Sequence, residues 1–227
     1  EKGLAALRHT ASHVMAQAVK RLYPETKLAI GPSIADGFYY DVDPATPLTA
    51  EDLPKIEAEM KKIIKQGHEI TRFTLPREEA IKFMKEKDEP YKVELIEELP
   101  EGEEISFYDQ GGFVDLCAGP HLMSTKGVKA FKLTASSMAY WRGDSNKARL
   151  HRIYGTAYNK KEDLKAHLER MEEAKKRDHN KLGREMELFT TVDVIGQGLP
   201  LMMPKGTKMI MKLQRWIEDL EDKEWGY

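Results

Sequence analysis

The stretch that decides the fold is residues 105–158, ISFYDQGGFVDLCAGPHLMSTKGVKAFKLTASSMAYWRGDSNKARLHRIYGTAY. It is dense in β-branched and aromatic residues, and turn-forming residues interrupt it at short intervals. This composition is typical of closely spaced strands. Strands are expected at residues 105–108, 128–134, 138–141 and 148–156.

The residues before this stretch begin with a helical pattern. Between residues 4 and 22, apolar side chains recur with a period of 3.6 and form one stripe. Residues 51–66 repeat the pattern, with Thr49 as the expected N-cap and Gly67 as the end of the helix. Pro76 is expected to open a short helix that runs through Lys85.

Strand patterns lie between these helices. Phe38, Tyr40 and Val42 alternate as in a half-buried strand after a turn at residues 36–37, and residues 68–75 alternate in the same way. Helices followed by a strand-rich second half predict an α+β fold, with helices packed on one face of a largely antiparallel sheet. Beyond it, we expect a long charged helix over residues 161–187, turns over 196–206 and an amphipathic helix over 207–223.

Composition excludes several classes of protein. The chain has 227 residues, of which 33% are charged and 41% are hydrophobic, and its formal net charge is −2. It is therefore neither a disordered tail nor a globally basic nucleic-acid binder, and any contact with RNA must be local. One cysteine excludes an internal disulfide, and there is no signal-peptide pattern and no apolar run of about 18 residues. We expect a soluble, cytoplasmic protein.

Two short motifs carry the chemistry. In His9-Thr10-Ala11-Ser12-His13, the i, i+4 spacing places both imidazoles on one face of the first helix, away from its apolar stripe. Two surface histidines with this spacing also arise by chance, because an HxxxH string alone is a weak motif.

The second motif is Asp115-Leu116-Cys117-Ala118-Gly119-Pro120-His121. Asp115 and Cys117 have the strand period of two, and Gly119 and Pro120 predict a turn that presents His121. A lone cysteine is otherwise a small buried apolar residue. Together, His9, His13, Cys117 and His121 offer four nitrogen or sulfur groups suited to a metal site or a hydrolytic pocket.

These motifs, with further ones, resemble bacterial-type threonyl-tRNA synthetase. The similarity also includes Gly37-Phe38-Tyr39-Tyr40-Asp41, Tyr91-Lys92-Val93, and Tyr140 to Ser145 with Ile153 to Ala157. The resemblance implies an editing domain at residues 1–158, a linker helix at 159–185, and the start of a class II catalytic domain at 186–227. HxxxH and CxxxH also occur in alanyl-type editing domains, but GFYYDVD and Tyr91-Lys92-Val93 favour the threonyl family.

The resemblance also implies that parts of the family's protein are missing from this chain. An N-terminal ubiquitin-like domain, the ATP-binding motifs, the catalytic zinc ligands and the anticodon-binding domain are expected elsewhere in a full-length parent, which is expected to be a homodimer. We therefore expect a fragment that neither activates threonine nor charges tRNA. Its partner is the 3′ end of tRNA(Thr), and no membrane is involved.

The implied activity is hydrolysis of mischarged Ser-tRNA(Thr). Serine lacks one methyl group of threonine, and one such group is worth only about 1–3 kcal/mol of discrimination, so a second, smaller pocket is needed. The resemblance places Lys92, His9, Asp115, Cys117 and His121 in that pocket, with Tyr40 lining it. His9 and Lys92 are assigned to water and leaving-group chemistry, and Asp115 to the substrate ammonium or hydroxyl. Cys117, His13 and His121 are assigned to shape and orientation, with Lys92 and Asp115 on the rim.

Two alternatives stay open. The first concerns metal: we expect none, because a closed four-ligand site leaves no room for catalytic water, but a zinc ion would be held by His9, His13, Cys117 and His121. The second concerns function: a stand-alone trans-editing deacylase of alanyl or threonyl type would use the same pocket without residues 186–227, and a non-catalytic tRNA-binding module would need no such cluster.

Overall fold

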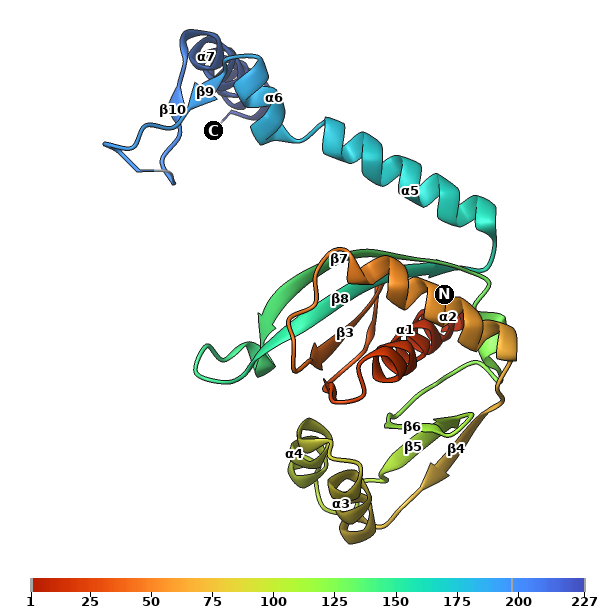
Figure 1. Ribbon diagram of the computed structural model, residues 1–227. Coiled ribbons are helices and arrows are strands. Elements are labelled where there is room, and N and C mark those ends of the chain that lie inside the picture. The colour runs from red at the N-terminus through yellow and green to blue at the C-terminus, as the bar shows by residue number, and fades with distance from the viewer. Residues whose placement is uncertain (1, 197, 227) are drawn as a thin grey trace. The chain divides into compact units, whose positions relative to one another are not determined.

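The computed structural model describes residues 2–196 and 198–226. Gln197, inside the turn region expected at 196–206, lies outside the described residues, as do Glu1 and Tyr227 at the ends of the first and last predicted domains. The chain divides into two compact units, of which the first runs to Lys165 and the second begins at Ala166. Figure 1 shows their elements.

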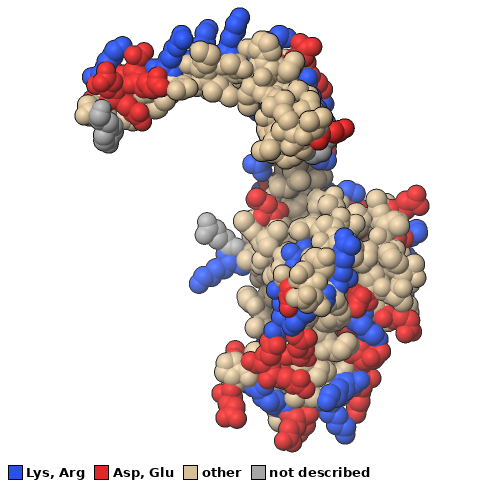
Figure 2. Space-filling view, turned by 90° about the vertical axis from the view of Figure 1, so that its left-hand side faces the viewer, with Lys and Arg blue, Asp and Glu red and all other residues tan. Residues whose placement is uncertain are grey.

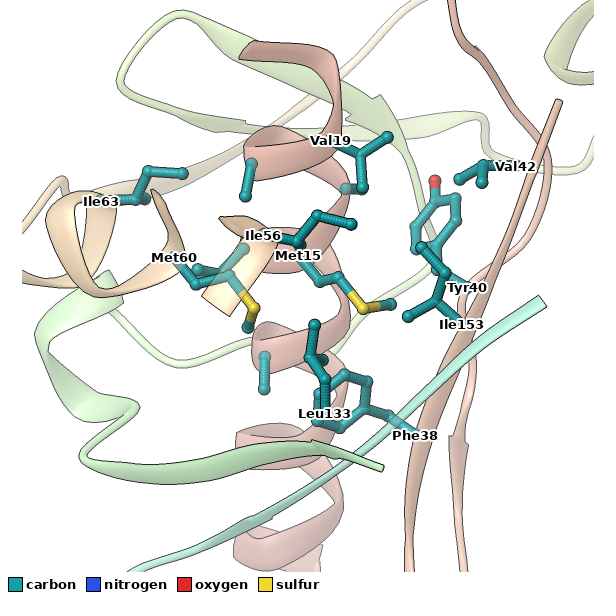
Figure 3. Packing of buried hydrophobic residues seen from close by; sticks show 14 of the residues in the cluster. Met15, Val19, Phe38, Tyr40, Val42, Ile56, Met60, Ile63, Leu133 and Ile153 are labelled. Atoms are coloured by element: carbon teal, nitrogen blue, oxygen red, sulfur yellow. The ribbon is translucent and has the colours of Figure 1, made fainter. Parts of the chain in front are cut away.

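The first unit contains a five-stranded sheet covered by two helices. The strands are β1 (Lys27–Leu28), β2 (Ser33–Ile34), β3 (Gly37–Asp43), β7 (Ala130–Tyr140) and β8 (Arg149–Tyr158). Their order is β1-β3-β8-β7, with β2 also paired to β3. The helices are α1 (Lys2–Leu22) and α2 (Asp52–Gln66). Figure 3 shows Met15 of α1 between Met60 of α2 and Ile153 of the sheet, so this helix is buried from both sides.

A second, smaller sheet lies in the same unit. It consists of β4 (Ile70–Thr74), β5 (Ser106–Gln110) and β6 (Phe113–Leu116), and it packs with α3 (Arg77–Glu86) and α4 (Pro90–Glu98). Its core contains three aromatic rings, with the Phe107 centroid 5.4 Å from that of Phe73 and 5.6 Å from that of Phe83. Two short 3₁₀ turns, η1 (Thr125–Gly127) and η2 (Trp141–Gly143), flank β7.

Several local expectations are wrong. Residues 128–134 and 138–141 are one strand, β7, because the continuous β8 pairs along both, with a register shift between Leu133 and Ala135. Thr49 does not cap α2; its hydroxyl and amide instead donate to Asp52, at 3.0 and 2.8 Å. Helix α4 was not expected from periodicity, since its nine residues are too few to show a clear pattern.

The second unit begins inside a helix. Helix α5 (Lys161–Lys176) is followed by α6 (His179–Glu185), so the single helix expected over 161–187 is broken. The break has a local cause: the Asp178 carboxylate accepts a hydrogen bond from the Lys181 amide at 2.9 Å and caps the second helix. The remaining elements are β9 (Phe189–Thr190), β10 (Leu201–Met202), α7 (Pro204–Leu220) and a π turn, η3 (Glu221–Trp225).

The predicted α+β class is confirmed. Every strand pairing in the described part of the chain is antiparallel, and the helices of the first unit pack on its sheets. No helix in residues 2–196 and 198–226 is both long and apolar enough to cross a membrane. Figure 2 shows both basic and acidic side chains on the surface in view, in line with the nearly equal numbers of the two kinds in the sequence.

Candidate active site

Helix α1 carries the two histidines of the first motif into the interior. Its residues from Leu7 to Val19 are buried almost without interruption, because the large sheet, α2 and the residues around β6 surround it. His13 is only 4% exposed and His9 is half-buried. The side of α1 opposite its apolar stripe therefore faces another part of the protein rather than solvent.

That part is the turn after β6. The Ser106 hydroxyl donates to the Cys117 carbonyl at 2.6 Å, and the Cys117 amide donates to the Ser106 carbonyl at 3.1 Å, so β5 holds the start of the turn. Gly119 has a φ of +76°, and a Cβ there would lie 2.2 Å from the Tyr108 hydroxyl oxygen, so only glycine fits. The chain then reverses and returns His121 towards α1.

The two motifs meet in one cluster. The Sγ of Cys117 lies 3.2 Å from Nε2 of His9 and 3.2 Å from Nε2 of His121. One ligand atom from each of these residues and from His13 lies within 4.8 Å of the other three. The His9 and His121 rings stack with centroids 4.4 Å apart. We name these four residues, His9, His13, Cys117 and His121, the His/Cys cluster.

A buried carboxylate binds one histidine of this cluster and two residues next to it. Asp115, 2% exposed, accepts from Nδ1 of His13 at 3.0 Å, from Nζ of Lys92 at 2.6 Å and from the Tyr40 hydroxyl at 2.5 Å. Lys92, 3% exposed, also donates to the Tyr40 oxygen at 3.0 Å. The expectation that Lys92 and Asp115 lie on the rim is wrong, because α4 carries Lys92 inward and the β6 pleat turns Asp115 towards α1.

The charges of the cluster follow from these contacts. Burial lowers the pKa of His13, but the Asp115 carboxylate outweighs it and raises that pKa to about 9. Burial raises the pKa of Cys117, but hydrogen bonds from His121, His13 and His9 lower it to about 3. Burial lowers the pKa of His121 to about 4, against the hydrogen bond to Cys117. At neutral pH, a thiolate therefore lies beside a cationic His13 and a neutral His121.

The pKa values of Asp115 and its neighbour Tyr40 are shifted as well. Burial raises the pKa of Asp115, but the charges of Lys92 and His13 lower it below the usual range of carboxyl groups. Burial and the adjacent Asp115 raise the pKa of Tyr40. Lys92, Asp115 and His13 thus form an ionised chain that ends at the cluster, with the Tyr40 phenol as a neutral hydrogen-bonding partner.

Thr10 belongs to the site, although sequence reasoning did not find it. Its hydroxyl oxygen accepts from the Leu122 amide at 2.9 Å and lies 3.3 Å from Nδ1 of His121. Because the Cys117 thiolate requires an N–H donor at Nε2 of His121, the Nδ1 atom is left as an acceptor for the Thr10 hydroxyl. No sequence signal marks Thr10, since this partner lies 111 residues away.

Two cavities lie beside these residues. One has a volume of about 230 Å³ and is lined by the following residues: Leu95, Leu99, Glu103, Glu104, Ile105, Ser106, Leu116, Cys117 and Ala118. The other, of about 250 Å³, includes Lys20, Glu89 and Asp115 in its wall. A small group can therefore approach Cys117 along an apolar surface, whereas the second cavity borders the supporting carboxylate.

The donor set of the His/Cys cluster also fits zinc. Three imidazoles and a thiolate are zinc ligands, and Asp115 on Nδ1 of His13 and Thr10 on Nδ1 of His121 are partners that orient metal-bound imidazoles. Zinc supplies Lewis acidity and a bound water of lowered pKa where one position stays open. With all four residues as ligands, no position stays open for water.

Comparison with known proteins shows similarity to threonine–tRNA ligases. Residues 105–154 match the family described as "Threonyl and Alanyl tRNA synthetase second additional domain". The whole chain is 63% identical over 227 residues to a threonine–tRNA ligase of Clostridium perfringens, 62% identical to one of Clostridium botulinum strain Alaska E43, and 60% identical to one of Acetivibrio thermocellus. Each match covers 100% of this chain and 35% of the relative, so the chain spans about a third of the length of these curated relatives. The chain is therefore similar over its whole length to one part of these threonine–tRNA ligases.

Proposed function

We propose that the first unit hydrolyses the seryl ester of mischarged tRNA(Thr), as the editing activity of a threonyl-tRNA synthetase. The observation that carries the proposal is the His/Cys cluster itself: a thiolate meets three imidazoles, of which His13 is cationic because of Asp115 and His121 is neutral because of burial, and Cys117 lines a 230 Å³ cavity. The matches to tRNA synthetases support a substrate that contains tRNA, and we propose that it is an aminoacyl ester at the 3′ end.

We assign a role to each of these residues from its exposure to solvent and its contacts. His9 is half-buried, and its Nε2 faces the Cys117 thiolate, so its Nδ1 is the atom we assign to hold the attacking water. Cationic His13 supplies the positive charge that favours a developing oxyanion. Asp115 is 2% exposed, so we assign it to orient His13 rather than to bind the substrate ammonium.

Lys92 receives a different role for the same reason. Its ammonium is 2.6 Å from Asp115 and almost fully buried, so we propose that it neutralises this carboxylate instead of acting on the leaving group. Without Lys92, the negative charge of Asp115 would be compensated by His13 alone. Asp115 would then lose the contact that fixes its position, and the orientation of His13 would be less well defined.

Selectivity for serine requires a rigid wall against the extra methyl group of threonine. The wall we propose is the α1 face with the turn at Cys117, since both are held by buried hydrogen bonds, including those from Ser106 and to Thr10. A compliant wall would admit threonine and remove the discrimination.

The decisive experiment is deacylation of Ser-tRNA(Thr) and Thr-tRNA(Thr) by the 227-residue chain. We expect the seryl ester to be hydrolysed and the threonyl ester to be spared, and we expect His9→Ala to abolish the activity. His68→Ala is the matched control, because His68 bonds to Gln66 at an exposed position outside the cluster. Binding of tRNA without deacylation of either ester would favour the non-catalytic tRNA-binding module instead.

Two finer points belong to the same proposal. We propose that catalysis uses water and side chains without zinc; elemental analysis of the purified protein, followed by deacylation after chelation, tests this, and loss of activity that zinc restores would overturn it. We also propose that the activity works in cis within a cytoplasmic, homodimeric synthetase, because identity to ligases extends through residues 186–227. Activity that requires no residue after 185 would favour a trans-editing factor.

A further inference from the structure

The turn between β7 and β8 packs against the helix that carries Lys92. This turn includes η2, whose Trp141 is 3% exposed. The Tyr91 and Trp141 rings meet edge to face, with centroids 5.1 Å apart, and the Tyr91 hydroxyl donates to Asp43 at 2.6 Å. The motif Tyr140 to Ser145 therefore contacts α4, and none of its residues belongs to the His/Cys cluster.

Polar contacts reinforce this packing. The Trp141 indole N–H donates to Oε2 of Glu94 at 3.0 Å, and Lys147 donates to Oε1 of the same carboxylate at 3.1 Å. Arg142 pairs with Glu98 one turn further along α4. Exposed ion pairs contribute little to the stability of the folded protein on their own. A buried indole N–H that loses its acceptor, in contrast, lowers this stability. The Trp141 to Glu94 hydrogen bond is therefore the contact that matters most.

The two faces of α4 have different partners. Tyr91, Glu94 and Glu98 have the spacing of one helical face, and all three contact the β7–β8 turn or β3. Lys92 and Ile96, four residues apart, lie on the next face and are both buried. Because α4 has only nine residues, its own propensity does not hold it in place, and its orientation depends on these outside contacts.

We propose that Trp141 is a positioning residue for the editing site. By donating its indole N–H to Glu94 on one face of α4, Trp141 fixes the rotation of the helix and so places the Lys92 ammonium against Asp115, with which Lys92 forms a 2.6 Å ion pair. Only the kinetic part of this inference rests on the proposed function. The structural part concerns how firmly Lys92 is held.

The first test measures protection of Lys92 without any substrate. Reductive methylation of the folded protein, read out by mass spectrometry, gives the reaction rate of each lysine. Trp141→Phe keeps an aromatic ring at this position and removes the N–H donor together with part of the buried indole. We expect Lys92 to react about fivefold faster in this variant, the change that corresponds to loss of one hydrogen bond. Glu94→Ala, at a partly exposed position, removes the acceptor of the Trp141 N–H and repeats the test if Trp141→Phe fails to fold.

The controls separate local loosening from general destabilisation. Lys20, which is paired with Glu89 in the same unit, is expected to keep its wild-type rate, and Trp216→Phe in α7 is expected to leave Lys92 protected. Unchanged labelling of Lys92 in both the Trp141 and the Glu94 variant would overturn the inference, as would an equal rise in the labelling rate of Lys20.

The second test is kinetic. If the chain deacylates Ser-tRNA(Thr), Trp141→Phe is expected to lower kcat and leave KM unchanged, because Lys92 acts through Asp115 and not on substrate binding. A rise in KM with kcat unchanged would contradict the positioning role. Absence of deacylation by the wild-type chain would contradict the proposed function alone, since the labelling experiment decides the structural inference by itself.

Discussion

Nδ1 of His13 lies 3.0 Å from Oδ2 of Asp115, and both side chains are almost fully buried. The two residues come from a helix and a strand that are about a hundred residues apart in sequence. The contact makes the imidazole cationic and directs its other nitrogen towards the Cys117 thiolate. The electrostatics of the His/Cys cluster therefore depend on a carboxylate that is itself held by Lys92.

Removing the charge of Asp115 is expected to destabilise the protein strongly. Asp115→Asn keeps the shape but leaves the buried Lys92 ammonium without a counter-charge, a situation that costs about 3–5 kcal/mol. Urea unfolding at pH 7 measures the free energy of unfolding. Glu104→Gln, which breaks an exposed pair with Arg72, is the control and should have little effect. A similar small effect of both substitutions would show that Asp115 is not the centre of the buried chain.

Neither His13 nor His121 is expected to make deacylation depend on pH between about 5 and 8. An ordinary histidine, with a pKa of roughly 6.5, would change charge in this range. Here, His13 has a pKa of about 9 and loses its proton only above that value, and His121 has a pKa of about 4 and gains a proton only below it. The rate of deacylation should therefore fall above a pH of about 9 and below a pH of about 4. NMR titration of the imidazoles measures both values, and a midpoint near 6.5 for His13 would contradict them.

Tyr40 is expected to affect the rate more than the selectivity. Its ring is fully buried in the core, so Tyr40→Ala creates a cavity that costs about 3–5 kcal/mol and obscures any effect on the site. Tyr40→Phe removes only the hydroxyl that bonds to Asp115 and Lys92. We expect this variant to hydrolyse the seryl ester about tenfold more slowly, since a hydrogen bond to a charged group is lost. Increased hydrolysis of the threonyl ester would show that the hydroxyl forms part of the wall.

Replacing Lys92 is expected to abolish removal of serine. Lys92→Ala leaves Asp115 without its closest cation, and we expect the rate to fall about a hundredfold or more, as for removal of one catalytically important electrostatic contact. Single-turnover deacylation measures the loss. Lys62→Ala, at an exposed position on α2, is the matched control. Full activity of Lys92→Ala would exclude this lysine from the mechanism.

Thr10 is expected to select the tautomer of His121. Thr10→Val has nearly the same shape but no hydroxyl, so Nδ1 of His121 loses its donor and the Leu122 amide loses its acceptor. Thr10→Ser retains both contacts. We expect ¹⁵N NMR to show His121 protonated at Nε2 in the wild type and in Thr10→Ser, and a tautomer mixture in Thr10→Val. An Nδ1-protonated ring in the wild type would instead indicate that Nε2 binds a metal.

Local patterns in the sequence were enough for much of the fold. The i, i+4 spacing of His9 and His13 defined one face of α1, alternation at Phe38, Tyr40 and Val42 predicted β3, and Gly67 predicted the end of α2, which it caps with a φ of +70°. These features depend on side-chain period and backbone sterics within a few residues, so no distant contact is needed to predict them.

The electrostatic arrangement of the site depended on tertiary structure alone. Helix α4 exists and is oriented because Trp141 and its neighbours hold it, and its orientation buries Lys92 beside Asp115. No local pattern predicts this, because the nine residues of α4 show no clear period and their partners lie about fifty residues away. The charges of His13 and Cys117 also follow from burial and from groups brought together by folding. A pKa is a property of surroundings, and a sequence determines these only once the chain has folded.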